Sequence, residues 1–393
     1  MTCLLIHDAQ LMTPDGLIPE GWLLIEEGRI AALGEGQPSR APRAERLDGR
    51  ARDGWIALPG FIDVHVHGGA GRDTMDATPE ALATMARFYA ACGVTGFLAT
   101  TVTAPGPETL RALENVAACM GAIGPESGGA ALLGAHLEGP YLNANMRGAQ
   151  DGQYIRRADP EEYRPWLALN VIRHVTVAPE FPENHAFMAD CVAQGVNVGI
   201  GHTQATYEEA LAAVERGARQ VTHTFNAMTG LHHRRPGMAG AALALDALVC
   251  EVIADNIHLH PAILRLIARA KGPGGVVLIT DAIQGAGMPE GVYDLGGQEV
   301  TVAGNTAKLA DGTLAGSVLT MDAALRNMLA ADLPLDMIWP MTSATPAAQI
   351  GLGDRKGWLH PGYDGDMVLL DADFRVQATI VGGHIVHQAA PGA

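Results

Sequence analysis

Apolar and polar positions along the middle of this chain alternate between two patterns. Short apolar runs of strand length recur, and the segments between them carry apolar residues at helical spacing. Strands that alternate with helices in this way are typical of a parallel α/β barrel. The strands are expected at Ile56–Val66, Val94–Thr101, Ala130–Leu137, Val171–Ala178, Val196–Gly201, Gln220–Thr224, Leu248–Ala254 and Val276–Thr280.

The segment after the first expected strand illustrates how the sequence marks a helix. Thr78 is suited to cap its start, Pro79 to occupy its first turn, and Gly93 to follow its end. The apolar stripe of this helix, which we expect to pack in the core, consists of Leu82, Met85, Ala86, Tyr89 and Ala90.

Both ends of the chain have a different pattern, in which short β-like runs are separated by turn residues. Two β-rich ends around a mixed middle indicate that the termini fold together. We expect residues 1–54 and 355–393 to form one small β-sandwich domain, and residues 55–354 to form a (β/α)8 TIM-like barrel. A chain of 393 residues is long enough for both, because such a barrel needs about 250 residues.

The composition limits which partners the protein can have. Hydrophobic residues make up 48% of the chain, which is enough for a large core. The formal net charge of −17 argues against a nucleic acid or an anionic membrane surface as a partner. A small anionic substrate is compatible with this charge only if the chain supplies a local basic pocket.

The cysteines and the length of the apolar runs indicate in which cellular compartment the protein is expected. Five cysteines without a CxxC pair predict reduced thiols, and they argue against a disulfide framework or a cysteine-rich zinc site. The sequence contains no apolar run of the roughly 20 residues that span a bilayer, and its start lacks the pattern of a secretion signal. We therefore expect a soluble, cytoplasmic protein.

Metal-binding residue types stand at the ends of the expected strands. His65 and His67 alternate along the first strand, so both imidazoles face the same side. Glu138 follows an apolar run, where a bare carboxylate is costly unless it is paired or binds a metal. Chemistry in such barrels takes place where the strands end, so we expect one divalent metal site at the mouth. The remaining members of the set are His202, His223 and Asp281.

This set of residues predicts metal-dependent hydrolysis. A divalent metal lowers the pKa of a bound water and polarises a carbonyl oxygen. Asp281 could take the proton of that water and pass it to a leaving amine. The sequence has no GxSxG motif for a serine nucleophile. Imidazole and carboxylate ligands suit zinc, which we expect first, as well as iron, manganese or cobalt.

Seven sequence blocks, in order along the chain, resemble those of the amidohydrolase superfamily and, within it, of the N-acetylglucosamine-6-phosphate deacetylase family. The resemblance implies a barrel with a terminal β-sandwich and a homodimer. It also implies hydrolysis of N-acetyl-D-glucosamine 6-phosphate to D-glucosamine 6-phosphate and acetate in amino-sugar catabolism or cell-wall recycling. The blocks are PGFIDVHVHGG, HLEGPYLN, GHTQA, THTFNAM, RRPG, LITDAIQGAG and GTLAGSVLTMDAALRNM.

The resemblance also assigns roles at the metal site. It makes Glu138, His202 and His223 the primary metal ligands, and Asp281 the general base and acid. Many barrels of the superfamily bridge two metals with a carbamylated lysine, but this chain has no lysine between the HxH motif and His202. Glu138 is then the available bridge to a second ion at His65 and His67, so one or two ions per subunit are expected.

The substrate residues follow from the same resemblance. Asn226, the backbone of Ala227, and His258 match phosphate contacts. Arg234, in the basic block LHHRRPG, matches an arginine that reaches the neighbouring subunit's site. Gln150 stands where many relatives have a histidine that contacts sugar hydroxyls. This difference leaves N-acetylgalactosamine 6-phosphate open as the substrate.

Two further alternatives remain open from the sequence. The first is an amidohydrolase that acts on a cyclic amide or another N-acyl compound, for which phosphate would not matter. The second is a non-catalytic barrel that serves as a scaffold. The complete set of metal-binding and acid/base residues argues against the scaffold.

Overall fold

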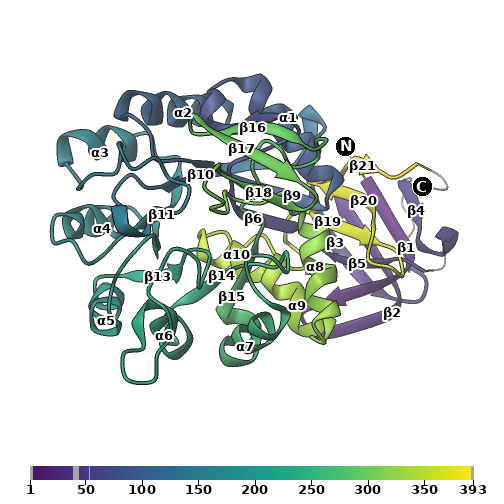
Figure 1. The fold of residues 1–393 in the computed structure, drawn as a ribbon. Coiled ribbons are helices and arrows are strands. Elements are labelled where there is room, and N and C mark those ends of the chain that lie inside the picture. Colours follow the sequence, from purple (N-terminus) through teal and green to yellow (C-terminus); the bar gives the residue numbers. More distant parts are fainter. Residues whose placement is uncertain (1–2, 39–43, 53, 391–393) are drawn as a thin grey trace.

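The apolar runs in the middle of the chain form a parallel eight-stranded sheet that closes into a barrel (Figure 1). The computed structural model describes residues 3–38, 44–52 and 54–390. The last strand returns to the first, where the Asp281 N–H donates a 2.9 Å hydrogen bond to the carbonyl of His65. The predicted barrel is therefore confirmed. Its strands are β6 (Phe61–Val66), β9 (Val94–Thr101), β10 (Ala131–Glu138), β11 (Ile172–Val177), β12 (Asn197–Ile200), β13 (Ala218–Val221), β14 (Val249–Ile253) and β15 (Val276–Ile279).

The first expected strand, Ile56–Val66, is two strands that belong to different sheets. β5 (Ile56–Pro59) joins the terminal sheet, and β6 joins the barrel. The break lies at Gly60, where a Cβ atom would overlap the side chain of Thr95. The run looked continuous in the sequence because both strands are almost fully buried, so the apolar pattern does not change between them.

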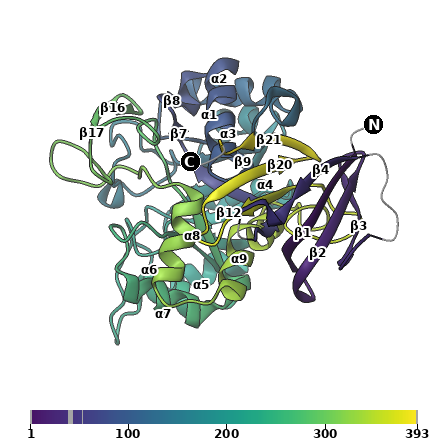
Figure 2. The ribbon, with the colours of Figure 1, turned by 90° about the vertical axis from the view of Figure 1, so that its right-hand side faces the viewer.

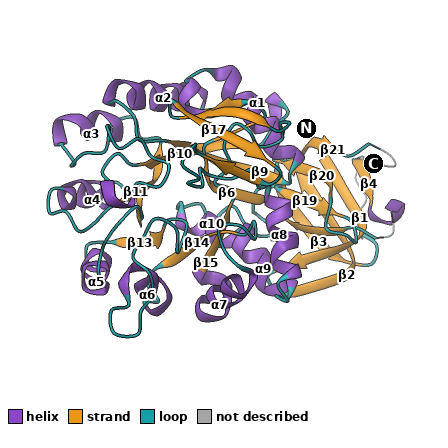
Figure 3. Cartoon of the chain, in the orientation of Figure 1, coloured by secondary structure: helices purple, strands orange, loops and turns teal. Residues whose placement is uncertain are grey.

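The helices cover the outside of the barrel (Figure 3). The predicted cap is confirmed, since the side chain of Thr78 accepts a hydrogen bond from the Ala81 N–H at the start of α1. The helices are α1 (Pro79–Ala91), α2 (Gly106–Cys119), α3 (Pro160–Leu167), α4 (Asn184–Ala193), α5 (Tyr207–Glu215), α6 (Gly237–Ala244), α7 (Pro261–Lys271), α8 (Met321–Ala330), α9 (Leu335–Thr342) and α10 (Ala344–Gln349).

The two ends of the chain meet in a separate sheet beside the barrel (Figure 2). The predicted terminal β domain is thus confirmed, and its strands form one continuous sheet around their own apolar cluster. The boundaries at residues 54 and 355 stay a prediction, and residues 1–2, 39–43, 53 and 391–393 lie outside the described part. The strands are β1 (Cys3–Thr13), β2 (Gly16–Glu26), β3 (Arg29–Glu35), β4 (Glu45–Asp48), β5, β19 (Met367–Leu370), β20 (Val376–Val381) and β21 (His384–Gln388).

A small antiparallel sheet is inserted between β15 and α8. It projects from the barrel on the side away from the terminal sheet (Figure 2). Its strands are β16 (Gly291–Leu295), β17 (Gln298–Ala303) and β18 (Thr306–Lys308), and a two-stranded ribbon of β7 (Gly68–Gly69) and β8 (Arg72–Asp73) follows the first barrel strand.

Two expectations from the composition can be compared with the structure. All five cysteines are free, and three of them are buried. Among the described residues, no helix combines the length and the apolar character that crossing a bilayer requires.

Candidate metal centre

Six polar side chains meet at the carboxyl ends of the barrel strands, where the sequence predicted the chemistry. β6 and β10 carry three of them, and the residues that directly follow β12, β13 and β15 include the other three. All six are buried, where a polar group is costly without a partner. They are His65, His67, Glu138, His202, His223 and Asp281.

Three of these residues adopt a left-handed backbone conformation, with φ of 47° at His202, 29° at His223 and 50° at Asp281. Residues with a Cβ rarely adopt it, and it costs roughly 1–3 kcal/mol each. Hydrogen bonds hold two of the turns, because the Asp281 N–H donates to the carbonyl of His65 and the His223 N–H donates to Glu251 Oε2. The three residues all line the cavity at the barrel mouth.

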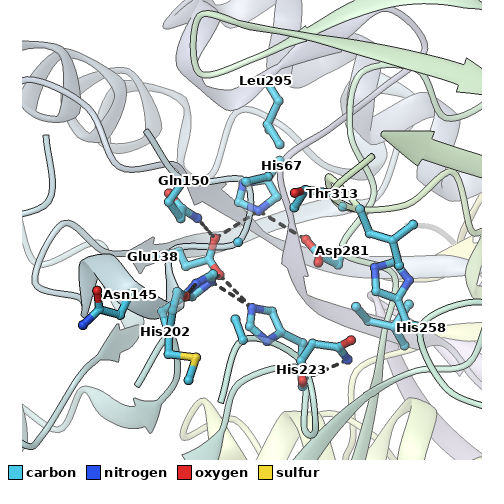
Figure 4. Close-up of a pocket in the computed structure, with 18 residues that line it drawn as sticks. His67, Glu138, Asn145, Gln150, His202, His223, His258, Asp281, Leu295 and Thr313 are labelled. Atoms are coloured by element: carbon cyan, nitrogen blue, oxygen red, sulfur yellow. Dashed lines mark hydrogen bonds and ion pairs between the residues drawn. The ribbon is translucent and has the colours of Figure 1, made fainter. Parts of the chain in front are cut away.

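The first ligand group consists of Glu138, His202 and His223 (Figure 4). Glu138 Oε1 lies 3.1 Å from His202 Nε2 and 3.3 Å from His223 Nε2, and the two imidazole nitrogens are 3.0 Å apart. His202 Nδ1 donates to the carbonyl of Met146 (2.8 Å), so Nε2 of the neutral ring carries a lone pair. Three ligand atoms so close together, one with its lone pair facing the others, fit a divalent cation.

The second ligand group consists of His65, His67 and Glu138. His67 Nε2 lies 3.3 Å from Glu138 Oε2, and His65 Nε2 lies 3.6 Å from Glu138 Oε1. Asp281 Oδ1 is 3.5 Å from His65 Nε2 and 3.3 Å from His67 Nε2. His65 Nε2 is buried without a hydrogen-bond partner among the described residues, and a cation would supply one. Because Glu138 belongs to both groups, the residues fit one ion or two.

The imidazoles control the charge of the two carboxylates. Burial alone raises the pKa of Glu138, but the neighbouring imidazoles, His65 first among them, hold it well below its ordinary value. Burial also opposes ionisation of Asp281, yet the charge of His65 and the hydrogen bond from His67 lower its pKa below the ordinary value. Asp281 is therefore ionised at neutral pH, the form that can accept a proton.

A cavity of about 340 Å³ opens at this centre, a size typical of small-molecule sites. Asp281 and every member of the two ligand groups except His65 line it. Leu295 on β16 and Thr313 also line it, so the inserted sheet and the segment after it form part of the wall (Figure 4).

The structure divides the four residues that the resemblance links to phosphate. Asn226, Ala227 and His258 line the cavity, whereas Arg234 is exposed and lines a separate cavity of about 420 Å³. His258 Nδ1 lies 2.7 Å from Asp255 Oδ2. Burial lowers the pKa of His258, but the hydrogen bond to Asp255 and the charges of Asp255 and Asp281 together raise it above the ordinary value. A protonated imidazole in this wall is suited to an anion.

Gln150 lines the cavity with both ends of its amide bound to protein groups. Its Nε2 donates to Glu138 Oε2 (2.6 Å), and its Oε1 accepts a hydrogen bond from the Thr103 N–H (2.7 Å). The side chain thus lies beside Glu138, the residue that both candidate ligand groups share. These two bonds leave the second N–H of Nε2 and the second lone pair of Oε1 unused.

The sequence analysis missed Glu251, a fully buried residue of β14. It lies 3.0 Å from His65 Nδ1 through its Oε2 atom. A signal for it existed, because an acidic residue inside the apolar run LVCEVIA is costly to bury without a function or a partner. His136, two residues before Glu138 on β10, is packed in the interior and shares a 2.8 Å hydrogen bond with Thr176.

Residues 56–386 match the sequence model of the amidohydrolase family. The chain belongs to this family. The amidohydrolase is 39% identical over 385 residues to an N-acetylglucosamine-6-phosphate deacetylase of Bacillus subtilis, which covers 97% of this chain and 96% of that protein. It is also 39% identical over 380 residues to an N-acetylgalactosamine-6-phosphate deacetylase of Escherichia coli O157:H7, covering 96% of this chain and 97% of that protein.

Solved structures show the same relationship for the amidohydrolase. A variant of the N-acetyl-D-glucosamine-6-phosphate deacetylase of Mycobacterium smegmatis, in complex with N-acetyl-D-glucosamine-6-phosphate, superposes with a TM-score of 0.91 at 34% identity. That match covers 98% of this chain and all of the other. The deacetylase of Thermotoga maritima superposes with a TM-score of 0.87 at 31% identity, over 98% of this chain and 100% of the other.

Proposed function

We propose that this amidohydrolase removes the acetyl group from N-acetyl-D-glucosamine 6-phosphate, giving D-glucosamine 6-phosphate and acetate. The observation that carries the proposal is the pairing of two kinds of groups in one cavity. The metal-binding cluster with Asp281 is suited to amide hydrolysis, and Asn226, Ala227 and His258 are suited to an anion. The two relatives described above, each 39% identical to this chain, are named as deacetylases of N-acetylated hexosamine 6-phosphates.

Asp281 is the proposed general base and acid. In its ionised form it accepts a proton from water as the water oxygen bonds to the acetamide carbon. When the C–N bond breaks, Asp281 returns this proton to the departing amine nitrogen. This gives acetic acid and the neutral amine, and Asp281 is again ionised. Acetic acid then loses its proton to solvent to become acetate.

The proposed metal ligands are Glu138, His202 and His223, with His65, His67 and Asp281 available for a second ion. When bound, a divalent cation lowers the pKa of water and polarises the acetamide oxygen. We propose zinc, and the same ligand types accept iron, manganese or cobalt.

A homodimer completes the proposed phosphate site. Arg234 is exposed and does not line the cavity at the metal centre of its own chain, so a second copy of the chain is the proposed recipient of its guanidinium. Guanidinium binds phosphate through paired charge-assisted hydrogen bonds. A local positive charge of this kind also explains how a chain with a net charge of −17 could attract an anionic substrate.

N-acetylgalactosamine 6-phosphate is the second candidate substrate. One relative named for that sugar, from Escherichia coli O157:H7, is 39% identical, but the Bacillus subtilis relative at the same identity and the two superposed structures are named for the glucosamine derivative, which therefore remains the first candidate. The two sugars differ in the orientation of one hydroxyl group, so the choice depends on the sugar-facing wall of the cavity, where Gln150 lies.

Acetate release from four substrates tests the proposal: each of the two N-acetylhexosamines, with and without the 6-phosphate. We expect the phosphorylated glucosamine derivative to have the highest kcat/KM and the unphosphorylated sugars to lose at least tenfold. Equal rates with and without phosphate would contradict the proposal and favour an amidohydrolase for other N-acyl compounds. The free thiols suit a reducing compartment, so we place this reaction of amino-sugar catabolism in the cytoplasm.

A further inference from the structure

A buried carboxylate that the proposed chemistry does not use lies behind the metal centre. Glu251 on β14 has no exposed surface, and each of its two carboxylate oxygens contacts two nitrogen atoms. Its Oε2 atom is 3.0 Å from His65 Nδ1 and 3.1 Å from the backbone nitrogen of His223. Its Oε1 atom is 2.6 Å from Gln220 Nε2 and 3.1 Å from His174 Nε2.

These four contacts compensate a charge that would otherwise be very costly to bury. Two of the contacts, those from Gln220 and His174, are made by Oε1 and involve no member of the ligand groups. The other two reach one residue of each ligand group, the side chain of His65 and the backbone of His223. Glu251 therefore touches both groups without belonging to either.

The contact with His65 decides which imidazole nitrogen carries the proton. An ionised carboxylate can only accept, so Nδ1 of His65 is the donor, and Nε2 of the neutral ring carries the lone pair. That Nε2 atom is the one without a hydrogen-bond partner among the described residues, and it lies 3.6 Å from Glu138 and 3.5 Å from Asp281. The arrangement holds the ring in the form that binds a metal.

His67, the other imidazole of the second ligand group, has among the described residues no acceptor at its Nδ1 atom comparable to Glu251. Its Nδ1 atom is buried and has no hydrogen-bond partner in the described part of the chain. Of the two imidazoles in the second ligand group, only His65 has its orientation and tautomer set by another side chain.

We infer that Glu251 is a positioning residue that builds the second ligand group by fixing the tautomer and orientation of His65. The inference rests on the proposed function only in requiring a metal centre, and it does not depend on the sugar. Loss of the carboxylate should weaken the ion at His65, His67 and Glu138 more than the ion at Glu138, His202 and His223, where Glu251 contacts only the backbone of His223.

Metal titration of the full-length protein, freed of metal by a chelator, tests this without substrate. Zn²⁺ binding is followed by calorimetry, and Co²⁺ by its visible absorption. We expect two ions per chain for the wild type. In Glu251→Gln, which keeps the shape but places an NH2 group where an acceptor is needed, the second ion should bind roughly 10- to 100-fold more weakly. Glu251→Asp, which retains the carboxylate, should recover part of this loss.

The matched control is His174→Gln, which changes a partner of the other carboxylate oxygen and keeps a donor there. It should bind two ions as the wild type does.

The inference is wrong if folded Glu251→Gln binds both ions normally, if the control loses as much affinity, or if the wild type binds only one ion. If Glu251→Gln does not fold, nitrogen NMR of the metal-loaded wild type decides, because a proton on Nε2 of His65 in that state would overturn the inference. If Glu251→Gln loses affinity for the second ion but the wild type releases no acetate from the phosphorylated sugars, the proposed substrate is wrong and the role of Glu251 stands.

Discussion

The interiors of the terminal sheet and of the barrel differ in kind, although both are built from buried β-strands. The terminal strands enclose a cluster of apolar side chains such as Leu23, Ile25 and Leu369. The barrel strands enclose polar side chains that bind one another. Besides the six residues of the centre, the buried polar set of the barrel includes Asp63, Thr100, His136, His174, Thr176, Gln220, Thr222 and Glu251.

The difference shows how one chain separates stability from chemistry. Apolar contacts stabilise in proportion to the area buried, with little dependence on direction. Buried polar groups stabilise little in net terms, but they fix geometry because each one must keep its partner. We therefore expect substitutions in the barrel mouth to change chemistry, and substitutions in the terminal sheet to change stability.

The largest expected effect is at Asp281. Asp281→Asn removes the group that accepts and returns the proton, so kcat for acetate release should fall roughly 10²–10⁴-fold. The melting temperature should stay within a few degrees of the wild-type value, because no apolar contact is lost. Measured metal content provides the control, and near-normal turnover in a folded, metal-loaded variant would refute the role of Asp281.

The opposite effect is expected in the terminal sheet. Leu23 has no exposed surface, so Leu23→Ala should lower the free energy of unfolding by about 2–5 kcal/mol while kcat per folded molecule is unchanged. Leu17 on the same strand is 49% exposed, and Leu17→Ala should change stability by less than about 0.5 kcal/mol. Urea unfolding measures both. A large loss of kcat in Leu23→Ala would show that the two interiors are not independent.

A smaller effect, confined to substrate recognition, is expected for Arg234. Loss of one charge-assisted contact is worth about 1.5–3 kcal/mol, so Arg234→Ala should lower kcat/KM for the phosphorylated sugar roughly 10- to 100-fold. The unphosphorylated sugar should be unaffected. Arg235→Ala changes the adjacent exposed arginine and serves as the control. Equal losses for both variants would point to the net charge of the loop instead of a specific contact.

The smallest effect concerns pH and the ion pairs beside the terminal sheet. Asp364 Oδ2 lies 2.9 Å from Lys356 Nζ and 2.7 Å from Arg355. Burial raises the pKa of Asp364, but the two cations outweigh it and lower the pKa below 3.8. Because the folded pKa lies below the unfolded one, the carboxylate stabilises the fold above about pH 3.8, and this stabilisation is lost as the pH falls through the folded pKa.

Asp364→Asn should therefore be less stable than the wild type at pH 7, and the gap should narrow as the pH drops below 3.8. Urea unfolding of both proteins across this range measures the gap. A gap that is the same at every pH would mean that the asparagine is disfavoured for reasons other than charge.

The positions of the six centre residues could be predicted because two simple rules apply to them. Side chains two residues apart on a strand face the same way, which placed His65 with His67. Parallel strands in a barrel end at the same rim, and this rule placed the other four together: Glu138, His202, His223 and Asp281. Neither rule needs contacts between distant parts of the chain to be known.

The features that were missed depend on such contacts. Glu251 lies 186 residues from His65 in the sequence, and only the closed barrel brings them together. The amide orientation of Gln150 depends on a bond to Glu138 that no local pattern encodes. The division of Ile56–Val66 between two sheets was hidden because β5 and β6 are both buried.

That division has a consequence for how the protein can be engineered. Only Gly60 separates the last residue of a terminal-sheet strand from the first residue of the strand that carries His65 and His67. The first barrel strand, β6, is therefore held at its start by β5, which pairs with β1 and β19 of the terminal sheet. A catalytic barrel cut out of this chain would begin with an unanchored ligand strand, so a transplant to another scaffold must carry β5 and its partners along.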